Sequence, residues 1–223
     1  MRTAVLISGS GSNLQALIAA TRAPDHPAEI ALVLSNRPEA AGLDHAREAG
    51  IASQVVDQKD YAGPDRTAAR AAFDASLTGA LEAAGIELVC LAGFMRVLTG
   101  DFVAHWRDRL INIHPSLLPA FPGLDTHARA LAAGVKLHGC TVHFVREAVD
   151  SGPIIGQAAV PVLAGDTPET LAARVLAVEH RLYPACLRLV AEGRAKVVGE
   201  RVAIPEASPG SRNAATALLH PQA

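Results

Sequence analysis

The sequence predicts an α/β protein with a Rossmann-like, mostly parallel sheet that carries helices on both faces. Short and continuously apolar runs alternate with segments of helical spacing through the first half of the chain. Strands that are apolar along their whole length are typical of a sheet buried on both faces. Hydrophobic residues make up 50% of the chain and aromatic residues only 4%, so we expect a core of Ala, Val, Leu and Ile.

The elements expected in the first half follow this alternation. The expected strands span residues 3–7, 29–34, 52–56, 88–92 and 110–113. A helix is expected to start at Asn13, and two more are expected over 40–50 and 65–84. Gly50 is expected to close the second helix, because glycine readily adopts the left-handed conformation found at helix C-termini.

The second half has a different pattern. Two strand-like runs, 140–145 and 154–160, flank a segment that contains Asp150, which predicts an antiparallel strand pair or a long functional loop. A long C-terminal helix is expected over 167–192, with Thr167 as its cap, proline in its first turn and Glu169 complementing its dipole. We expect one domain over 1–193. The extension 194–223 is expected to be partly loose, because 205–221 is rich in Pro, Gly, Ser and Ala.

Composition excludes several classes of protein. The net charge of −2 leaves no broad basic field, which argues against a nucleic-acid partner. The three cysteines are far apart and form no CxxC pair, so neither a disulfide framework nor a zinc site is expected. The apolar run at the N-terminus is too short for a signal peptide, and no run reaches membrane length. We therefore expect a cytoplasmic protein with no membrane association.

A glycine-rich loop, SGSGSN at 8–13, lies between the first expected strand and helix. Such a loop brings backbone N–H groups and a helix N-terminus to a phosphate, and Ser12 and Asn13 add donors. The dinucleotide fingerprint needs glycine where Leu14 stands, and the P-loop needs a Gly-Lys-Ser/Thr ending that is missing. The loop therefore favours a monophosphate over NAD or ATP. A plain connecting turn with a Ser/Asn cap is the alternative.

The segment Asn112-Ile113-His114-Pro115 carries the second candidate site. Asn112 and His114 are two residues apart, so on a strand they point to the same side, where the end of a parallel strand meets the ligand crevice. Asparagine offers an amide donor and histidine a titratable ring, and together they can stabilise an oxyanion and move a proton. Asp150 can orient the imidazole or pair with its charge.

The alternative interpretation is that His114 is a structural histidine and Asn112 a turn residue, since most of the nine histidines need no role. His127, His138 and His143 also lie near the candidate site. No histidine pair shows the i, i+4 spacing of helical metal ligands, so we expect no metal.

Five motifs in order resemble the family of phosphoribosylglycinamide formyltransferases, from Met1 to about Gly193. They are SGSGSNL at 8–14, AGFMR at 92–96, NIHPSLLP at 112–119, HGCTVHFV at 138–145 and DSGPII at 150–155. The resemblance implies transfer of the formyl group of 10-formyltetrahydrofolate to the amine of glycinamide ribonucleotide in purine synthesis. It implies direct attack by the amine, small-molecule substrates, a monomer or homodimer, and no metal.

The resemblance also implies roles for individual residues, with the ribonucleotide phosphate held by the N-terminal half and the folate by the C-terminal half. The implied catalytic residues are Asn112, His114 and Asp150. The implied ribonucleotide ligands are Gly11, Ser12 and Asn13 for the phosphate and Glu179 for the sugar. The implied folate-binding residues are Arg70, Met95, Arg96, Val97, Leu98, Asn112, Val145 and Asp150. Two departures are Asp125, where the family often has histidine, and Ser10, where asparagine is common.

Three rival functions share some of these features. A formyltetrahydrofolate deformylase shares the Asn-x-His-Pro motif and the late aspartate, but it usually carries an extra N-terminal domain, and the phosphate loop favours a ribonucleotide over water. Methionyl-tRNA formyltransferase needs a further tRNA-binding domain and a basic surface. A non-catalytic nucleotide-binding module would not require Asn112, His114 and Asp150 together.

Overall fold

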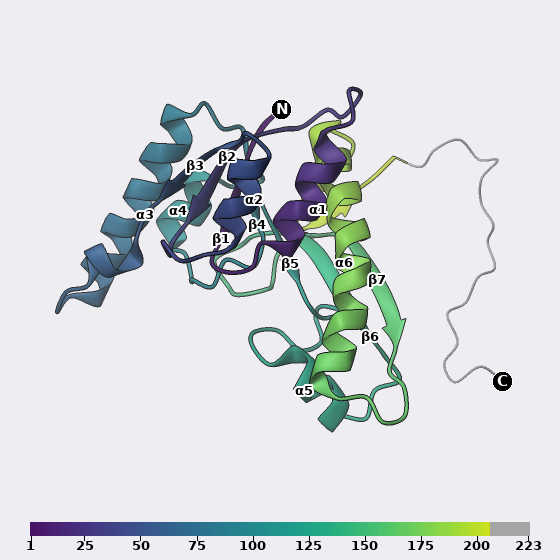
Figure 1. The fold of residues 1–223 in the computed structure, drawn as a ribbon. Helices are drawn as coiled ribbons and strands as arrows, with labels where there is room; N and C mark the ends of the chain where they lie inside the picture. Colours follow the sequence, from purple (N-terminus) through teal and green to yellow (C-terminus); the bar gives the residue numbers. More distant parts are fainter. Residues whose placement is uncertain (206–223) are drawn as a thin grey trace.

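The computed structural model describes residues 1–205 and is built on a seven-stranded sheet (Figure 1). The strand order is β3-β2-β1-β4-β5-β6-β7. The strands are β1 (Arg2–Ile7), β2 (Glu29–Ser35), β3 (Ala52–Val55), β4 (Leu88–Leu91), β5 (Leu110–His114), β6 (Leu137–Phe144) and β7 (Ile154–Pro161). Strands β1 to β5 are parallel, while β6 runs antiparallel to both β5 and β7. The mostly parallel sheet and the late antiparallel pair are confirmed.

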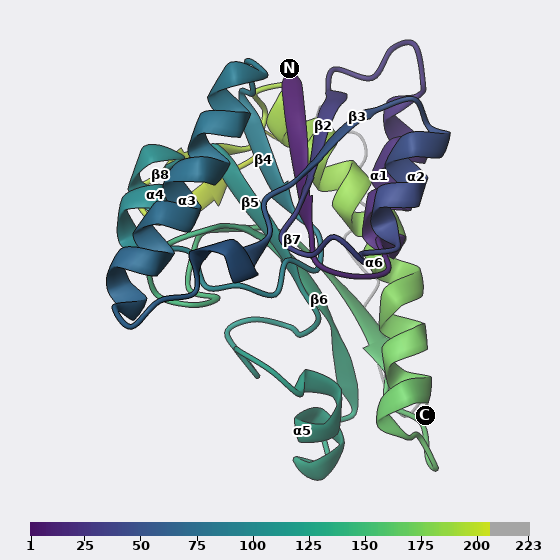
Figure 2. The same ribbon diagram turned by 60° about the vertical axis from the view of Figure 1, so that its left-hand side comes forward.

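Helices cover both faces of the sheet, as predicted. They are α1 (Ser12–Thr21), α2 (Gly42–Glu48), α3 (Arg66–Ala83), α4 (Gly100–His105), α5 (Thr126–Ala132) and α6 (Pro168–Ala191), with a short 3₁₀ helix η1 (Gln58–Tyr61). Helices α1, α2 and α6 lie on one face, and α3 and α4 on the other (Figures 1 and 2). The two faces bury separate aliphatic clusters, one with α1, α2 and α6 and one with α3 and α4.

Strands β6 and β7 extend beyond the parallel strands and form a second, lower part of the molecule with α5 and the start of α6 (Figure 2). A third and smaller cluster fills this part, made of Ala130, Cys140, Val160, Leu171 and Val175. The connection from β6 to β7 carries Asp150, so the two alternatives given for this segment are both present: a strand pair and a long loop.

Side-chain caps fix the start of the two longest helices. Asp65 accepts hydrogen bonds from two backbone N–H groups at the start of α3. Thr167 accepts from the N–H of Thr170 at the start of α6, and the Thr170 side chain accepts in return from the N–H of Thr167. Such caps satisfy backbone donors that have no partner inside the helix. The predicted cap at Thr167 is confirmed.

The structure adds short elements that the sequence did not predict: η1, α4, α5 and a hairpin of β8 (Lys196–Val198) and β9 (Arg201–Ala203). Val197 and Val202 of the hairpin pack against the cluster beneath α6. The first part of the expected loose extension is therefore an ordered hairpin. Most of the proline-rich stretch 205–221 lies outside the described residues, and the domain limits stay a prediction.

No helix among residues 1–205 is both long enough and apolar enough to span a membrane.

Candidate active site

The end of β5 and the β6–β7 connection place a histidine beside a carboxylate. His114 is the last residue of β5 and is 6% exposed. Its Nδ1 lies 3.3 Å from Oδ2 of Asp150, which also accepts a hydrogen bond of 2.8 Å from the Gly123 N–H. Asp150 adopts the left-handed conformation, with φ of 54°. The predicted pair of His114 and Asp150 is thus brought together by two segments distant in sequence.

The two ring nitrogens of His114 both face acceptors. Nε2 lies 3.0 Å from the carbonyl oxygen of Phe121, and Nδ1 faces the Asp150 carboxylate. A neutral imidazole has one N–H and can satisfy only one acceptor, whereas the imidazolium donates from both nitrogens. The geometry therefore suits a protonated His114. Phe121 is itself left-handed, with φ of 55°.

His143 completes the cluster, and sequence reasoning gave it no role. It stands opposite Asn112 in the β5–β6 ladder. Its Nδ1 lies 3.0 Å from the Phe144 carbonyl, and its Nε2 lies 3.2 Å from Asn112 Nδ2 and 3.8 Å from Asp150 Oδ1. Burial lowers the pKa of His143, which keeps the ring neutral. Nδ1 then donates, and Nε2 accepts from the Asn112 amide.

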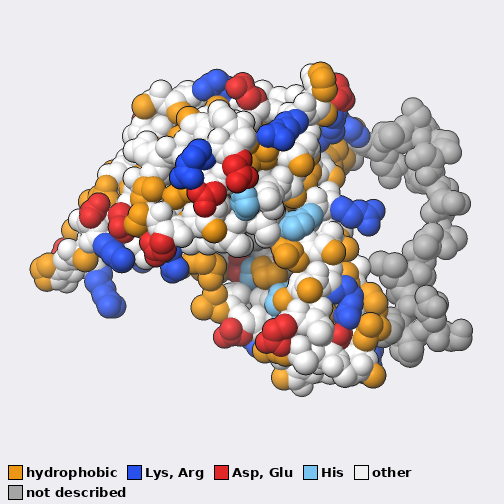
Figure 3. Space-filling view, in the orientation of Figure 1, with side chains coloured by type: hydrophobic (Ala, Val, Ile, Leu, Met, Phe, Trp, Pro, Cys, Tyr) orange, Lys and Arg blue, Asp and Glu red, His pale blue; other side chains and the backbone are white. Residues whose placement is uncertain are grey.

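This contact fixes the orientation of Asn112, since the amide nitrogen must face His143. The contact between Asn112 and His143 depends on the register in which β5 pairs with β6. The sequence pattern of a strand does not reveal that register. In the space-filling view, histidine and acidic side chains are visible in a hollow between the upper body and the part around α5 (Figure 3).

The glycine loop contacts the start of α2 too closely for a side chain. Gly11 has φ of 75°, and a Cβ there would stand 2.5 Å from the Cα of Gly42. Gly11 is the N-cap of α1, and no side chain caps this helix. The backbone N–H groups of its first turn are therefore available to an anion, and the helix dipole favours one.

Asn13 and Glu179, two predicted ribonucleotide ligands, touch each other between α1 and α6. Asn13 Nδ2 donates a hydrogen bond of 2.7 Å to Glu179 Oε2. Glu179 is 6% exposed, and burial raises the pKa of its carboxyl group, with the Asn13 bond acting in the opposite direction. Gly11, Ser12, Asn13 and Glu179 therefore lie near one another, and their binding of the ribonucleotide stays a prediction.

Two of the predicted folate residues, Asn112 and Asp150, belong to the cluster around His114, and the others lie near α3 and the segment after β4. Arg70, Val97 and Leu98 line a pocket of about 300 Å³ together with Glu147. Arg70 donates a hydrogen bond of 3.0 Å to the Val97 carbonyl oxygen. The remaining members adjoin them: Met95 and Arg96 precede Val97, and Val145 follows β6 and packs against the cluster beneath α3.

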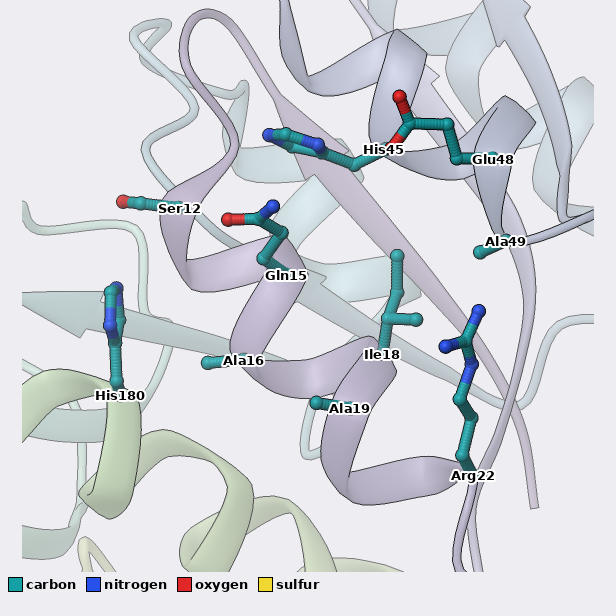
Figure 4. Close-up of a pocket in the computed structure, with 10 residues that line it drawn as sticks. All are labelled: Ser12, Gln15, Ala16, Ile18, Ala19, Arg22, His45, Glu48, Ala49 and His180. Atoms are coloured by element: carbon teal, nitrogen blue, oxygen red, sulfur yellow. The ribbon is translucent and has the colours of Figure 1, made fainter.

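A second pocket, of about 520 Å³, lies over α1 and α2 (Figure 4). Ser12 and His180 lie at one end of it and Arg22 at the other, with Gln15 and His45 between them. Through Ser12 this pocket adjoins the glycine loop. The cluster of His114 and Asp150 lines neither of these two pockets.

Cysteine nucleophiles do not fit the site. Cys90, Cys140 and Cys186 are free and buried, and burial raises the pKa of each thiol to about 12. Each therefore stays a thiol at neutral pH. Within residues 1–205 no three His, Cys, Asp or Glu side chains are grouped in a way that could hold a metal ion. The expectation of a metal-free reaction stays a prediction.

The fold and the cluster at the sheet edge define the class of protein. The formyl transferase family pattern matches residues 1–187, more than four-fifths of the chain. The chain belongs to the phosphoribosylglycinamide formyltransferase family: it is 45% identical to the Escherichia coli (strain K12) phosphoribosylglycinamide formyltransferase over 88% of this chain and 90% of that protein.

Other similarities agree. The structure of glycinamide ribonucleotide transformylase 1 from Symbiobacterium toebii matches with a TM-score of 0.86 and 53% identity, over 92% of this chain and 94% of that one. The bovine trifunctional purine biosynthetic protein adenosine-3 is 53% identical over 88% of this chain, which spans only 19% of that protein. A formyltetrahydrofolate deformylase from Burkholderia mallei matches at 30% identity and a TM-score of 0.80, over 92% of this chain and 70% of that one.

Proposed function

We propose that this protein transfers the formyl group of 10-formyltetrahydrofolate to the amine of glycinamide ribonucleotide in purine synthesis. One observation carries the proposal. The cluster of Asn112, His114 and Asp150 and the anion-type loop at Gly11 lie at the carboxyl edge of one sheet. Relatives that match over most of their length bear the name of this activity.

The acceptor substrate fits the loop and Glu179. Its phosphate binds the free N–H groups at the start of α1, next to Gly11 and Ser12. Its sugar hydroxyls bind the Glu179 carboxylate, which Asn13 already orients. The cosubstrate binds on the other side, along Met95–Leu98, with Arg70 and Val145 at its borders and Asn112 and Asp150 at its reactive end.

His114 and Asn112 stabilise the developing charge. As the amine nitrogen bonds to the formyl carbon, the carbonyl oxygen becomes negative. The His114 Nε2–H leaves the Phe121 carbonyl and donates to that oxygen, and Asn112 donates its second amide N–H. One well-placed donor of this kind is worth about 3–4 kcal/mol in other enzymes.

Asp150 orients His114 and accounts for the proton. Its carboxylate lies 3.3 Å from Nδ1 and accepts from an N–H at that nitrogen. The amine loses one proton, and the folate nitrogen gains one when its bond to the formyl carbon breaks. Asp150 relays this proton through a water molecule. The bonds and protons balance without a covalent enzyme intermediate, in agreement with the buried thiols.

Hydrolysis of the same donor is the second candidate, because a deformylase shares the fold at 30% identity. The two reactions differ only in the acceptor, an amine or water. The uncapped glycine start of α1 and the Asn13–Glu179 pair favour the amine of a phosphorylated acceptor, since hydrolysis of formyl-folate needs no phosphate site.

The deciding experiment measures the absorbance of the folate product with and without glycinamide ribonucleotide. Product that forms only with the ribonucleotide establishes the transferase. An equal rate without it establishes hydrolysis and contradicts the proposal. No product under either condition contradicts both reactions and supports a nucleotide-binding module.

A further inference from the structure

The two substrate regions meet where the sheet reverses its winding. β1 lies between β2 and β4, so the chain leaves β1 in one direction and β4 in the other. In open α/β sheets the ligand crevice forms at this point, outside the carboxyl ends of the strands. Ser8 follows β1 and begins the glycine loop. The predicted folate segment, Met95–Leu98, follows β4.

A chain of hydrogen bonds crosses this reversal point. The Met95 N–H donates to Ser8 Oγ at 2.8 Å, and the Ser8 hydroxyl donates to Asn36 Oδ1 at 2.6 Å. The Asn36 amide nitrogen donates to Gln58 Oε1 at 2.9 Å, and Arg96 Nη1 reaches the same oxygen at 3.4 Å. This series of hydrogen bonds begins at Met95 and ends at Arg96, two neighbouring residues of the folate segment.

The donor and acceptor of each hydrogen bond follow from the two groups at the ends of the series, the Met95 N–H and the Arg96 guanidinium. A backbone N–H and a guanidinium can only donate. The Ser8 hydroxyl oxygen therefore accepts from the Met95 N–H, and the hydroxyl donates a hydrogen bond to Asn36 Oδ1. The amide nitrogen of Asn36 then faces Gln58. Ser8 and Asn36 are 3% and 0% exposed, so a lost bond leaves a buried polar group unsatisfied.

The folate segment turns its side chains in opposite directions. Met95 and Val97 are exposed, at 59% and 57%, whereas Arg96 points inward and lies 4.1 Å above the Phe73 ring. Further anchors follow along the segment. Arg70 holds the Val97 carbonyl, and buried Asp74 accepts from the Thr99 N–H at 2.6 Å.

We propose that Ser8, Asn36 and Gln58 are positioning residues for the formyl donor, and that the Arg96 side chain is an anchor of the segment instead of a ligand of the folate. The hydrogen-bond chain holds the backbone of Met95–Leu98 in register with the glycine loop. This inference rests on the proposed function, because it takes that segment as the folate-binding wall.

The test substitutes Gln58, which lies outside both substrate regions. Gln58→Met keeps the length of the side chain but removes the acceptor for Asn36 and Arg96. Gln58→Glu keeps the acceptor oxygen. Gln54→Met, an exposed glutamine of β3, is the matched control. For each protein we measure the Kd of tetrahydrofolate by calorimetry, the KM values of both substrates, and kcat.

Gln58→Met is expected to weaken folate binding about five- to tenfold, the size of one ordinary hydrogen bond. Its ribonucleotide KM and kcat are expected to stay within about twofold. Gln58→Glu and Gln54→Met should match the unmodified protein. Unchanged folate binding in Gln58→Met overturns the inference, as does an equal loss for both substrates or a Gln58→Glu variant as weak as Gln58→Met.

Two further measurements keep the outcome decisive. If Gln58→Met does not fold, Asn36→Leu breaks the same series of hydrogen bonds between Ser8 and Gln58 and carries the same expectation. If the unmodified protein binds tetrahydrofolate but transfers no formyl group, the proposed function fails, while the Kd values still decide the positioning role. An unmodified protein that does not bind folate overturns both.

Discussion

At the scale of the residue, the two central histidines differ in what their ring nitrogens face. His114 faces two acceptors, a carbonyl and a carboxylate, whereas His143 faces one acceptor and one amide donor. The first environment suits the imidazolium and the second the neutral ring. Adjacent strands thus place two imidazoles with different hydrogen-bond partners around the same carboxylate.

Asp150→Asn is expected to lower kcat by about 10²–10³ while the ribonucleotide KM stays within about twofold, because the amide cannot charge-pair His114 or carry a proton. Asparagine tolerates the left-handed conformation, so the backbone is kept. The matched control is Asp125→Asn, since Asp125 is also left-handed, with φ of 56°, and is exposed. Steady-state kinetics check both variants, and an unchanged kcat for Asp150→Asn refutes the role given to Asp150.

Sequence could reach Asn112, His114 and Asp150 because their side chains carry the chemistry and their motifs are distinctive. The sequence could not predict that the Phe121 carbonyl accepts from His114, because every residue has a carbonyl oxygen. Only the conformation of the loop directs this one toward the ring. His143 was visible as a residue but not as the partner of Asn112, since pairing between β5 and β6 sets that contact.

At the scale of the element, ion pairs connect the hairpin β8–β9 to the loop that carries Asp150. Arg146, which begins that loop, bonds Asp108 and Glu200 at 2.8 Å each. Arg107 bonds the other oxygen of Glu200 at 2.7 Å. The side chain of Arg146 is 10% exposed, whereas that of Glu200 is 59% exposed and largely hydrated. The hairpin therefore fixes the start of the loop through one carboxylate.

Glu200→Gln is expected to lower Tm by a few degrees at most, since ion pairs between exposed side chains stabilise a protein only weakly. The loss should shrink at high salt, which screens exposed charges. Glu39→Gln, at an exposed site, provides the control. Thermal melts at low and high salt measure both, and equal shifts in the two variants argue against a specific link.

Length decided which elements sequence could predict. Helices α3 and α6 are long and show helical apolar spacing and clear caps, and the buried strands are continuously apolar. Helices α4 and α5 have six and seven residues, and β8 and β9 have three each, too few for a clear period to show. Helix α2 also has seven residues, and Gly50 after it supplied the additional signal. Tertiary contacts determine such segments, as Val197 and Val202 illustrate.

At the scale of the whole molecule, buried histidines link stability to pH. His138 is 1% exposed, its ring packs against His127, and the interaction with the Pro115 backbone only partly offsets its burial. Burial first, and His127 second, lower the pKa of His138 to about 4. An unfolded chain has a histidine pKa near 6.5, so it takes up protons before the folded protein does.

Stability contributed by this residue is therefore present above pH 6.5 and lost as the pH falls toward 4. His138→Leu removes the titrating group, so its Tm relative to the unmodified protein should be higher at pH 5 than at pH 7.5. Thermal melts at the two pH values measure the difference. Parallel Tm changes in the two proteins exclude His138 as a source of the acid sensitivity.

The left-handed residues around the site set a limit for protein engineering. Phe121 and Asp150 have φ of 55° and 54°, a conformation that glycine adopts at lower cost. At 121 the ring packs against the third cluster, so glycine there would lose that contact. At 150 selection for heat resistance alone would favour glycine, and the carboxylate would be lost. A thermostability screen of this chain must therefore score turnover in every round, or it will enrich well-folded, inactive proteins.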